Sequence, residues 1–377
     1  MSEIQVLPVL NHRDRETFLT FPWKIYANDP LWVPPLLPDL RKRTDPKRGV
    51  FFKRGTARYF VAWHNHEPVG TICVAEDRKS NEETGRREAI FGFFNFVEDY
   101  TVMEALLERA IHWASARGLT SLVGPFNLDY EDGYGILVEG RDRPPALMCG
   151  HTPPYYLEFV ERYGFIPARG DNLAFALDIT KDKPVFQELA QMAEHVRQRR
   201  KDILIRPADL SHWKDELERV YILLNRSLAH LPDHRPWQRE VVFENLAPFR
   251  KIADPELVLF AEIDGKTVGW FPGLPNLNEI FIHVNGLRKP CDYLKLWQHQ
   301  RQPIHCLTIK SILILPEYWG SGVVILLFDE MLRRARERNY KWLDFSLTSA
   351  DNPRTPVLAK RFGATLYKRY RVYRLEI

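Results

Sequence analysis

The stretch PEYWGSGVVILLFDEMLRRARERNY runs from Pro316 to Tyr340 and changes character near its middle. Gly320 and Gly322 follow closely on the apolar run ILIL (Ile312 to Leu315), and apolar residues then recur at helical spacing. The pattern predicts a buried strand, a tight glycine turn and a buried helix. Because a helix begins with unpaired N–H groups and a positive partial charge, such a turn can bind a phosphate group.

Length and composition predict two domains. The chain has 377 residues, of which 45% are apolar, and this exceeds what one core normally organises. A formal charge of +4 is too weak a bias for a dedicated DNA-binding protein. The N-terminus lacks the features of a secretory signal, and no apolar run approaches the ~20 residues of a membrane helix. We therefore expect a cytoplasmic protein with neither DNA nor a membrane as a partner.

Metal and redox chemistry are not indicated by the sequence. The four cysteines are scattered without CxxC spacing, so we expect reduced thiols and no metal site. The acidic side chains Asp129, Glu131 and Asp132 could gather a cation or an amine, although a solvated loop is the simpler interpretation.

The two halves of the chain resemble each other. YFVAWHNHEPVG (Tyr59 to Gly70) matches LVLFAEIDGKTVG (Leu257 to Gly269), each with two strands around a polar turn. ERYGF (Glu161 to Phe165) matches KRFGA (Lys360 to Ala364) at the same offset, each a short helix stopped by glycine. We infer a duplicated fold, in which the Val-Gly turns of the two halves superpose.

Two further helix features support this interpretation. A helix before Gly118 matches one before Asn339, and a buried strand follows each. Residues 181–202 join the two halves, and their apolar positions fall at helical spacing, which predicts a linking helix.

The order of strands and helices, with a glycine turn before a late helix, resembles the GCN5-related N-acetyltransferase (GNAT) superfamily. The whole chain is similar to the bacterial tandem members of that superfamily. The stretches that carry this second resemblance are FPWKIYANDPLWVPPL (Phe21 to Leu36), DPKRGVFF (Asp45 to Phe52), FGFF (Phe91 to Phe94), GPFN (Gly124 to Asn127), GILVEG (Gly135 to Gly140), PPYY (Pro153 to Tyr156) and LPEYWGSG (Leu315 to Gly322).

The resemblance implies a fold of the α/β (α+β) class with two tandem GNAT-like domains. Each domain would be a mixed, mostly antiparallel twisted sheet flanked by helices. We place a degenerate N-terminal domain at residues 1–182 and a C-terminal domain with a partly degenerate acyl-CoA loop at residues 183–377.

The resemblance also implies acetyl-CoA or another acyl-CoA as co-substrate. The family's loop carries Arg or Gln where this chain has Trp319, and Gly or Ala where it has Val324. Backbone amides could still hold the pyrophosphate, or the glycines could merely turn a strand tightly into a buried helix. The matching positions are Trp319, Gly320, Ser321, Gly322, Val323 and Val324, with Asn352 at the start of the last helix.

The first half lacks a corresponding loop. Its helix opens with Thr101-Val102-Met103-Glu104, which reads as a capping box in which Glu104 and Thr101 close the helix end. We therefore expect the first half to bind no CoA and to act as a structural or substrate-shaping partner.

Candidate catalytic residues come from the same resemblance. The family's tyrosine position falls on Ala359, so a substitute acid could come from the C-terminal strand, which offers Tyr367, Tyr370 and Tyr373; Tyr367 is our candidate. Glu317 could act as a base through water, and Asn352 is the third candidate. The simpler interpretations are a half-exposed strand for Tyr367 and a solvated carboxylate for Glu317.

Three functions remain open. The first is an acyl-CoA-dependent N-acyltransferase acting on a small-molecule amine or another acyl acceptor. The second is a non-catalytic ligand-binding protein whose cofactor loop has decayed. The third is transfer from another carrier such as aminoacyl-tRNA, which would need a basic groove. For that groove the sequence offers two basic clusters, at residues 197–201 and 368–374, which read more simply as solvated faces. The sequence does not indicate the oligomeric state.

Overall fold

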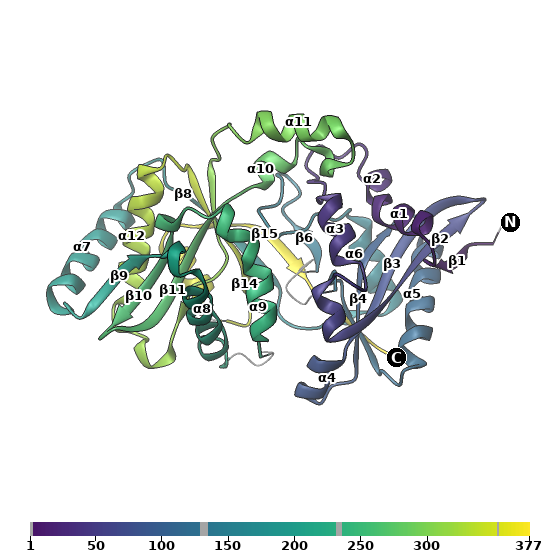
Figure 1. The fold of residues 1–377 in the computed structure, drawn as a ribbon, viewed down its shortest axis with the longest axis horizontal. Coiled ribbons are helices and arrows are strands. Elements are labelled where there is room, and N and C mark those ends of the chain that lie inside the picture. The colour runs from purple at the N-terminus through teal and green to yellow at the C-terminus, as the bar shows by residue number, and fades with distance from the viewer. Residues whose placement is uncertain (1–2, 129–134, 231–235, 353) are drawn as a thin grey trace. The chain divides into compact units, whose positions relative to one another are not determined.

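The computed structural model describes residues 3–128, 135–230, 236–352 and 354–377 (Figure 1). These form two compact units that do not follow the linear order of the chain. Unit 1 comprises Met1–Asn172, Asn278–Gln302 and Lys368–Ile377, and unit 2 comprises Leu173–Leu277 and Pro303–Tyr367. The division between residues 182 and 183 remains a prediction about where one duplicated half ends.

Unit 1 has one sheet with helices on both faces. Its strand order is β1-β2-β3-β4-β5-β16-β7, with β4 and β5 parallel and the other pairs antiparallel. The elements are β1 (Gln5–Pro8), α1 (His12–Thr20), α2 (Pro22–Ile25), α3 (Leu37–Arg43), η1 (Val50–Lys53), β2 (Gly55–His64), β3 (Glu67–Asp77), α4 (Arg78–Thr84), β4 (Glu88–Phe96), α5 (Tyr100–Ser115), β5 (Ser121–Gly124), β6 (Ile136–Glu139), α6 (Tyr155–Tyr163), β7 (Ile166–Pro167), α10 (Asn278–Phe281), η5 (Asn285–Leu287), α11 (Pro290–His299) and β16 (Tyr373–Glu376).

The two faces of this sheet are built by period-two alternation along its strands. On β3, Ile72 and Val74 pack with α5 and α6, whereas Cys73 and Ala75 pack with α1 and α3. Both faces are therefore apolar, and the sheet forms the middle of three layers.

Unit 2 repeats this plan. Its sheet runs β15-β8-β14-β12-β11-β10-β9, with β13 paired only to β11. The elements are β8 (Asn172–Asp178), α7 (Pro184–Arg199), β9 (Ile203–Pro207), η2 (Leu210–His212), α8 (Trp213–Ser227), α9 (Arg239–Leu246), η3 (Ala247–Lys251), η4 (Pro255–Leu257), β10 (Val258–Ile263), β11 (Lys266–Pro275), β12 (Cys306–Ile309), β13 (Leu313–Ile314), η6 (Pro316–Tyr318), α12 (Val323–Glu337), β14 (Trp342–Ser349), α13 (Arg354–Arg361) and β15 (Thr365–Arg371).

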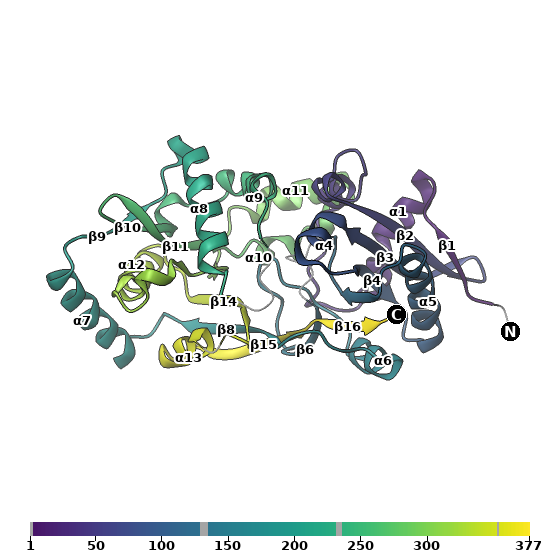
Figure 2. The same ribbon diagram turned by 90° about the horizontal axis from the view of Figure 1, so that it is seen from below.

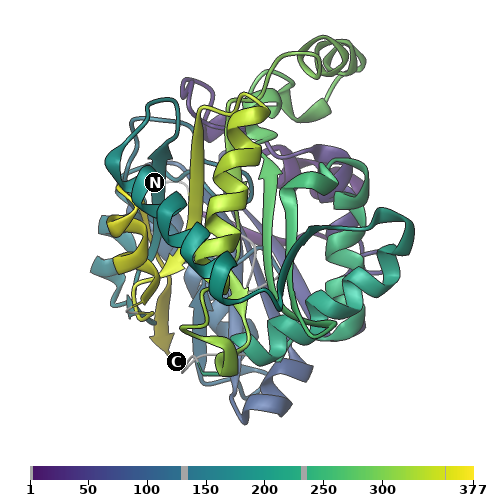
Figure 3. The ribbon, with the colours of Figure 1, turned by 90° about the vertical axis from the view of Figure 1, so that its left-hand side faces the viewer.

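Helices cover both faces of the unit 2 sheet. The core on one face joins α7, α12 and α13 to the strands, and α7 and α12 lie side by side (Figure 3). The core on the other face joins α8 and α9 to β10 and β11. The predicted linking helix is confirmed as α7, with Phe186, Leu189 and Ala193 buried.

The hairpins β2–β3 and β10–β11 confirm the duplication. Each has two turn residues with positive φ, Asn65 and His66 in one and Asp264 and Gly265 in the other. Each also has a register shift at the same place, after Ala62 in β2 and after Ala261 in β10. Ala62 pairs with Gly70, and Ala261 pairs with Gly269, so the two Val-Gly positions correspond.

The predicted helix ends correspond as well. Gly164 and Gly363 both have positive φ, and the amide after each donates five residues back, to Val160 O and Ala359 O. Gly118 and Asn339 likewise have positive φ at the ends of α5 and α12. These ends were predictable because a left-handed residue favours glycine or asparagine.

The C-terminal strands pass from one unit to the other along the chain. β15 belongs to unit 2 up to Tyr367 and to unit 1 from Lys368 on, where it pairs with β6. Figure 2 shows β15 leading into β16, which lies between β5 and β7. The last residues of the chain therefore complete the sheet that its first residues begin.

Candidate functional site

The glycine turn predicted to bind phosphate leads into an open helix end in unit 2. Gly320 and Gly322 both have positive φ (80° and 94°), which only glycine adopts readily. Gly322 is the N-cap of α12, and no side chain caps this end. The amides of Val323, Val324 and Ile325 precede the first intrahelical bond, from Leu326 N to Gly322 O, so they are available to an anion.

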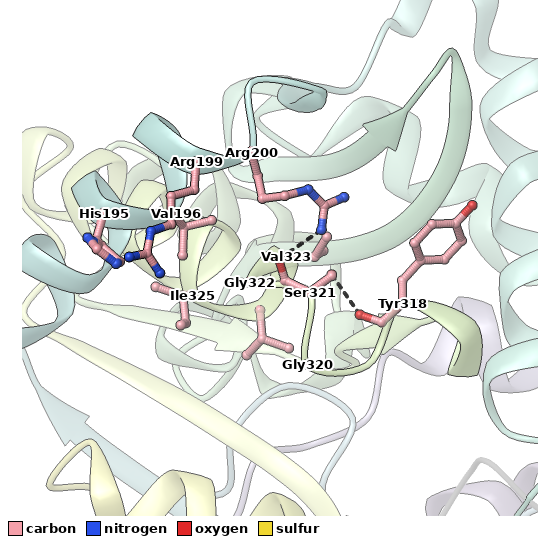
Figure 4. Close-up of a pocket in the computed structure, with 11 residues that line it drawn as sticks. His195, Val196, Arg199, Arg200, Tyr318, Gly320, Ser321, Gly322, Val323 and Ile325 are labelled. Carbon is pink, nitrogen blue, oxygen red and sulfur yellow. Dashed lines mark hydrogen bonds between the residues drawn. The ribbon is translucent and has the colours of Figure 1, made fainter.

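Helix α7 packs directly against this turn. A Cβ at Gly322 would lie 2.6 Å from Val196 Cγ1, so the glycine permits the close approach of α7. The approach brings Arg199 and Arg200 beside the turn, and Arg200 Nη1 lies 3.5 Å from Ser321 O (Figure 4). Arg200 is also held by both oxygens of Asp202, at 2.9 and 2.7 Å.

Together these elements form a pocket of about 300 Å³. Its walls are the helix end and the basic end of α7, so its electrostatic character suits a phosphate or pyrophosphate. The lining residues are His195, Val196, Arg199, Arg200, Tyr318, Gly320, Ser321, Gly322, Val323, Val324 and Ile325 (Figure 4). Arg199 and Arg200 were recognised only as part of a basic cluster, and their place at the turn was missed because it depends on how α7 packs.

Two of the predicted cofactor-binding residues lie elsewhere. Trp319 is outside the lining set: its indole donates to Ile314 O at 3.1 Å, and its ring lies 5.0 Å from that of His230. Asn352 follows β14, and its amide donates to Ser349 O at 3.1 Å. Five of the seven predicted residues therefore line one pocket, and a contact of these seven with a cofactor stays a prediction.

A β-bulge next to the turn opens the sheet of unit 2. Opposite β11, Gly273 pairs with Ile309 and Trp270 pairs with Leu313, so one extra residue lies between β12 and β13. The parallel pairing of β12 with β14 ends at Ile309 and Phe345, although β14 continues to Ser349. The strands therefore separate just before the glycine turn, which is where an extended ligand arm could lie between them.

A buried polar network lies where the strands separate. The Ser346 hydroxyl donates to Asp344 Oδ2 at 2.6 Å, and Lys310 Nζ donates to Ser346 Oγ at 2.9 Å. The Tyr367 hydroxyl donates to Asp344 Oδ1 at 2.7 Å. Burial raises the pKa of Asp344, while Lys310, Ser346 and Tyr367 oppose that shift. The network can therefore accept a proton on a carboxylate whose basicity burial increases.

The predicted catalytic residues have different surroundings. Tyr367 is buried and belongs to this network through Asp344. Glu317, on η6, is half-exposed, and its Oε1 lies 2.6 Å from Arg226 Nη2. Lys310, Asp344 and Ser346 were missed because nothing in their sequence pattern separates them from ordinary strand residues. A catalytic role of Glu317, Tyr367 or Asn352 stays a prediction.

The corresponding helix end in unit 1 is closed, but the predicted cap is wrong. The N-cap of α5 is Asp99, whose Oδ1 accepts from the amide of Thr101 at 2.9 Å. The helix begins at Tyr100, so Thr101 lies inside its first turn and cannot form the cap with Glu104. A carboxylate now occupies the position that a phosphate would need.

The gap between strands is also filled in unit 1. β4 carries a bulge at the matching position, because Thr71 pairs with Asn95 and Cys73 with Gly92. A Cβ at Gly92 would lie 1.7 Å from Phe126 O, so the backbone after β5 lies directly against β4. Phe126 N donates to Phe91 O at 2.7 Å, and Phe93 N donates to Asn127 Oδ1 at 2.8 Å. The FGFF and GPFN motifs thus join β4 to the backbone after β5, whereas the corresponding strands β12 and β14 of unit 2 stop pairing at Ile309 and Phe345.

Carboxylates neutralise most of the two basic clusters. In the first, Arg197 pairs with Asp329 and Arg200 with Asp202. In the second, Lys368 is buried, and desolvation lowers its pKa to about 8. The remaining arginines of the second cluster pair with carboxylates: Arg369 with Glu139 and Asp171, Arg371 with Asp171 and Glu161, and Arg374 with Glu88 and Glu376. A basic groove for a nucleic-acid carrier gains no support from these residues.

The described residues contain neither a metal site nor a membrane-spanning helix. Within residues 3–128, 135–230, 236–352 and 354–377, no group of His, Cys, Asp and Glu could hold a metal ion. Asp129, Glu131 and Asp132 lie outside these residues. No helix in the described part of the chain is both long and apolar enough to cross a membrane.

One part of this chain matches a known protein family, and the whole chain is similar to proteins of comparable length. Residues 217–364 match the acetyltransferase (GNAT) family. A bacterial ceramide synthase of Caulobacter vibrioides is 29% identical over 99% of this chain and 97% of its own length. Protein YghO of Escherichia coli is 26% identical over 98% of this chain and 94% of its own length. A tandem GNAT protein from the clavulanic acid biosynthesis pathway has the same fold, with a TM-score of 0.59, 14% identity and 99% and 98% coverage.

Proposed function

We propose that the chain is an acyl-CoA-dependent N-acyltransferase that works through unit 2, because residues 217–364 match the GNAT family and the chain shares its fold with a tandem GNAT protein. The observation that carries the proposal is the pocket at the uncapped N-terminus of α12, lined by Arg199 and Arg200. The amides, the helix dipole and the Arg199 guanidinium fit the pyrophosphate of CoA, and the Arg200 guanidinium lies beside them while it pairs with Asp202.

The acceptor we propose is a long-chain amino alcohol of the sphingoid class. The support is the whole-length similarity to a protein named bacterial ceramide synthase, since a ceramide is the N-acyl amide of such a base. In the reaction, the amine nitrogen bonds to the thioester carbonyl carbon, the C–S bond breaks, and the thiolate takes up a proton and leaves as CoA.

Asp344 is the proton acceptor in this proposal. The amine proton passes through Ser346 Oγ, which already donates to Asp344. Lys310 Nζ orients Ser346, and Tyr367 orients Asp344 from the other oxygen. Tyr367 is thus a positioning residue here, because its hydroxyl proton is engaged by the carboxylate.

The proposal is tested with purified protein in two steps. Calorimetry with acetyl-CoA, palmitoyl-CoA and free CoA measures binding, and mass spectrometry then detects amide formation with a sphingoid base and, as control, with a short amino alcohol. We expect CoA binding and amide formation with the long-chain amine. Binding without amide formation from either amine would favour the ligand-binding alternative, and no binding of any CoA would contradict the proposal.

Substitutions of Asp344 and Tyr367 test the proton path. Asp344→Asn is expected to lower kcat/KM by about 100-fold or more, which is the size of a general-base contribution. Tyr367→Phe removes a hydrogen bond from the charged form of Asp344, so its pKa rises and the acid limb of the pH profile of kcat/KM moves to higher pH. A thermal melt of each variant separates this effect from unfolding. An unmoved acid limb in folded Tyr367→Phe would exclude Asp344 as the acceptor.

A further inference from the structure

Helix α11, in unit 1, places apolar side chains in solvent. Tyr293, Leu294 and Trp297 are 52%, 66% and 52% exposed, and their spacing puts them on one face of the helix. Asp292 is buried, and Leu296 and His299 are half-buried on the opposite face. No other helix or strand of the described residues carries more than one exposed large apolar side chain. An ordinary surface helix turns its apolar face to the core, whereas α11 turns its apolar face to solvent.

Helix α11 is capped at its N-terminus, and the turn before it is anchored to unit 1. Its exposed apolar side chains therefore belong to an ordered element. Pro290 occupies the first turn, and Lys289 N donates to Asp292 Oδ2 at 2.9 Å. The preceding turn is fixed to the rest of unit 1, because Trp23 Nε1 donates to Asn285 Oδ1 at 2.8 Å. A Cβ at Gly286 would lie 2.5 Å from Pro35 O, so this turn packs closely.

The charges around the exposed face are mainly positive. Residues 285–302 contain four basic residues and one acidic residue, and the acidic Asp292 is buried. Arg288, Lys289, Lys295 and Arg301 are all exposed. The Arg301 guanidinium lies over the Trp297 ring, 4.0 Å from its centroid. A Trp, a Tyr and a Leu flanked by Lys and Arg is the composition of helices that lie in a membrane interface.

We propose that α11 binds the surface of an anionic lipid bilayer, with Tyr293, Leu294 and Trp297 inserted among the headgroups. A protein partner is less suited to this face. A stable interface buries about 600 to 1,000 Å² on each partner, and three side chains of at most about 250 Å² each, of which half to two-thirds is exposed, offer less than that. A bilayer needs no complementary shape, and its anionic headgroups match the exposed Lys and Arg side chains. The proposal revises the expectation from the sequence that a membrane is not a partner. A helix that lies on the membrane surface need not span it, so the proposal is compatible with the lack of a spanning helix in the described residues.

The test measures partition of the full chain onto vesicles by sedimentation. Vesicles of phosphatidylcholine and phosphatidylglycerol in equal parts are compared with phosphatidylcholine alone, at low and high salt. We expect the partition coefficient to be about tenfold or more higher on the anionic vesicles at low salt, and to fall as salt screens the charges. Equal binding to both vesicle types, or no binding to either, would overturn the proposal.

Paired variants locate the binding face. Leu294→Ser with Trp297→Ser is expected to lower partition onto anionic vesicles by about tenfold or more, because two inserted side chains are lost. The matched control is Leu10→Ser with Ile166→Ser, which removes two exposed apolar side chains from the same unit and should leave binding unchanged. Equal loss in both pairs would overturn the assignment to α11. Sedimentation velocity adds a second readout, since conversion of a dimer to a monomer by the α11 pair would show that a second copy covers this face.

This inference does not depend on the proposed acyl transfer. Vesicle binding needs no acyl-CoA and no amine, so it can succeed where the activity assay fails, and the reverse also holds. If both hold, α11 would keep the protein at the surface where long-chain amines reside.

Discussion

A chain that ends at Val372 is expected to lose the folded state of unit 1. The residues removed form β16, which lies between β5 and β7 within the sheet. Tyr373 is fully buried there, and removal of a buried aromatic side chain costs about 3 to 5 kcal/mol. Its hydroxyl also donates to Glu161 Oε1 at 2.8 Å, so a hydrogen bond is lost with the ring.

The loss of Arg374 adds an electrostatic cost. Its Nη1 lies 2.7 Å from Glu88 Oε1, and the Glu88 side chain is only 2% exposed. Removing one partner of a buried ion pair costs about 3 to 5 kcal/mol, and Arg86, at 3.7 Å from Glu88, compensates only in part. The combined loss is comparable to the ~5 to 15 kcal/mol that stabilises an ordinary domain.

Hydrogen exchange followed by mass spectrometry measures this effect in each unit. We expect the amides of β2, β3 and β4 to lose protection, while those of β10, β11 and α12 keep it. The control lacks only Ile377, which gives up one backbone hydrogen bond to Thr120 O. Unchanged protection of β2, β3 and β4 in the chain that ends at Val372 would show that β16 is dispensable.

The sequence predicted the features that depend on neighbouring residues. The polar turns at residues 65–66 and 264–265 require positive φ, and their Asn, Asp and Gly residues indicate it. Gly164 and Gly363 end their helices for the same local reason. Such signals repeat at a fixed offset in a duplicated chain, so both the repeat and the α/β class could be inferred.

The features that were missed depend on contacts between residues far apart in the chain. β16 lies beside β5, although Tyr373 and Gly124 are separated by most of the sequence. Arg199 reaches the glycine turn only because α7 packs on α12, and no periodicity encodes that partner. The predicted N-cap of α5 was Thr101, whereas the observed N-cap is Asp99. Both residue types are good N-caps, so the local sequence does not decide between them.

The largest effect on ligand binding is expected from Arg199→Glu combined with Arg200→Glu. Both arginines line the pocket at the N-terminus of α12, where the amides of Val323 and Val324 are available to an anion. Their replacement removes two cationic groups and introduces two carboxylates beside the pyrophosphate position. We expect the affinity for acyl-CoA to fall on the order of 100-fold, since charge-assisted phosphate bonds are the strong ones.

The matched control is Arg197→Glu on the same helix. Arg197 is outside the set that lines the pocket, so its reversal changes the net charge by half as much as the double variant without removing a pocket residue. Because Arg197 bonds to Asp329 of α12 at 2.6 Å, the folding of this variant is checked by the same melt. Calorimetry measures affinity at low and high salt, and a thermal melt checks folding, because Arg200→Glu also sets a carboxylate beside Asp202. The affinity of Arg197→Glu should remain near that of the unaltered chain.

The salt dependence separates a direct contact from a general change in charge. If Arg199 and Arg200 contact the phosphates, the double variant should lose most of the salt dependence of binding, because fewer cations are neutralised when the anion binds. If only the net charge matters, the loss of binding free energy in Arg197→Glu should be half of the loss in the double variant, because the net charge changes by half as much. The salt dependence of binding should change in the same proportion. Unchanged affinity in a folded double variant would mean that the glycine turn and Val196 serve only to pack α7 on α12.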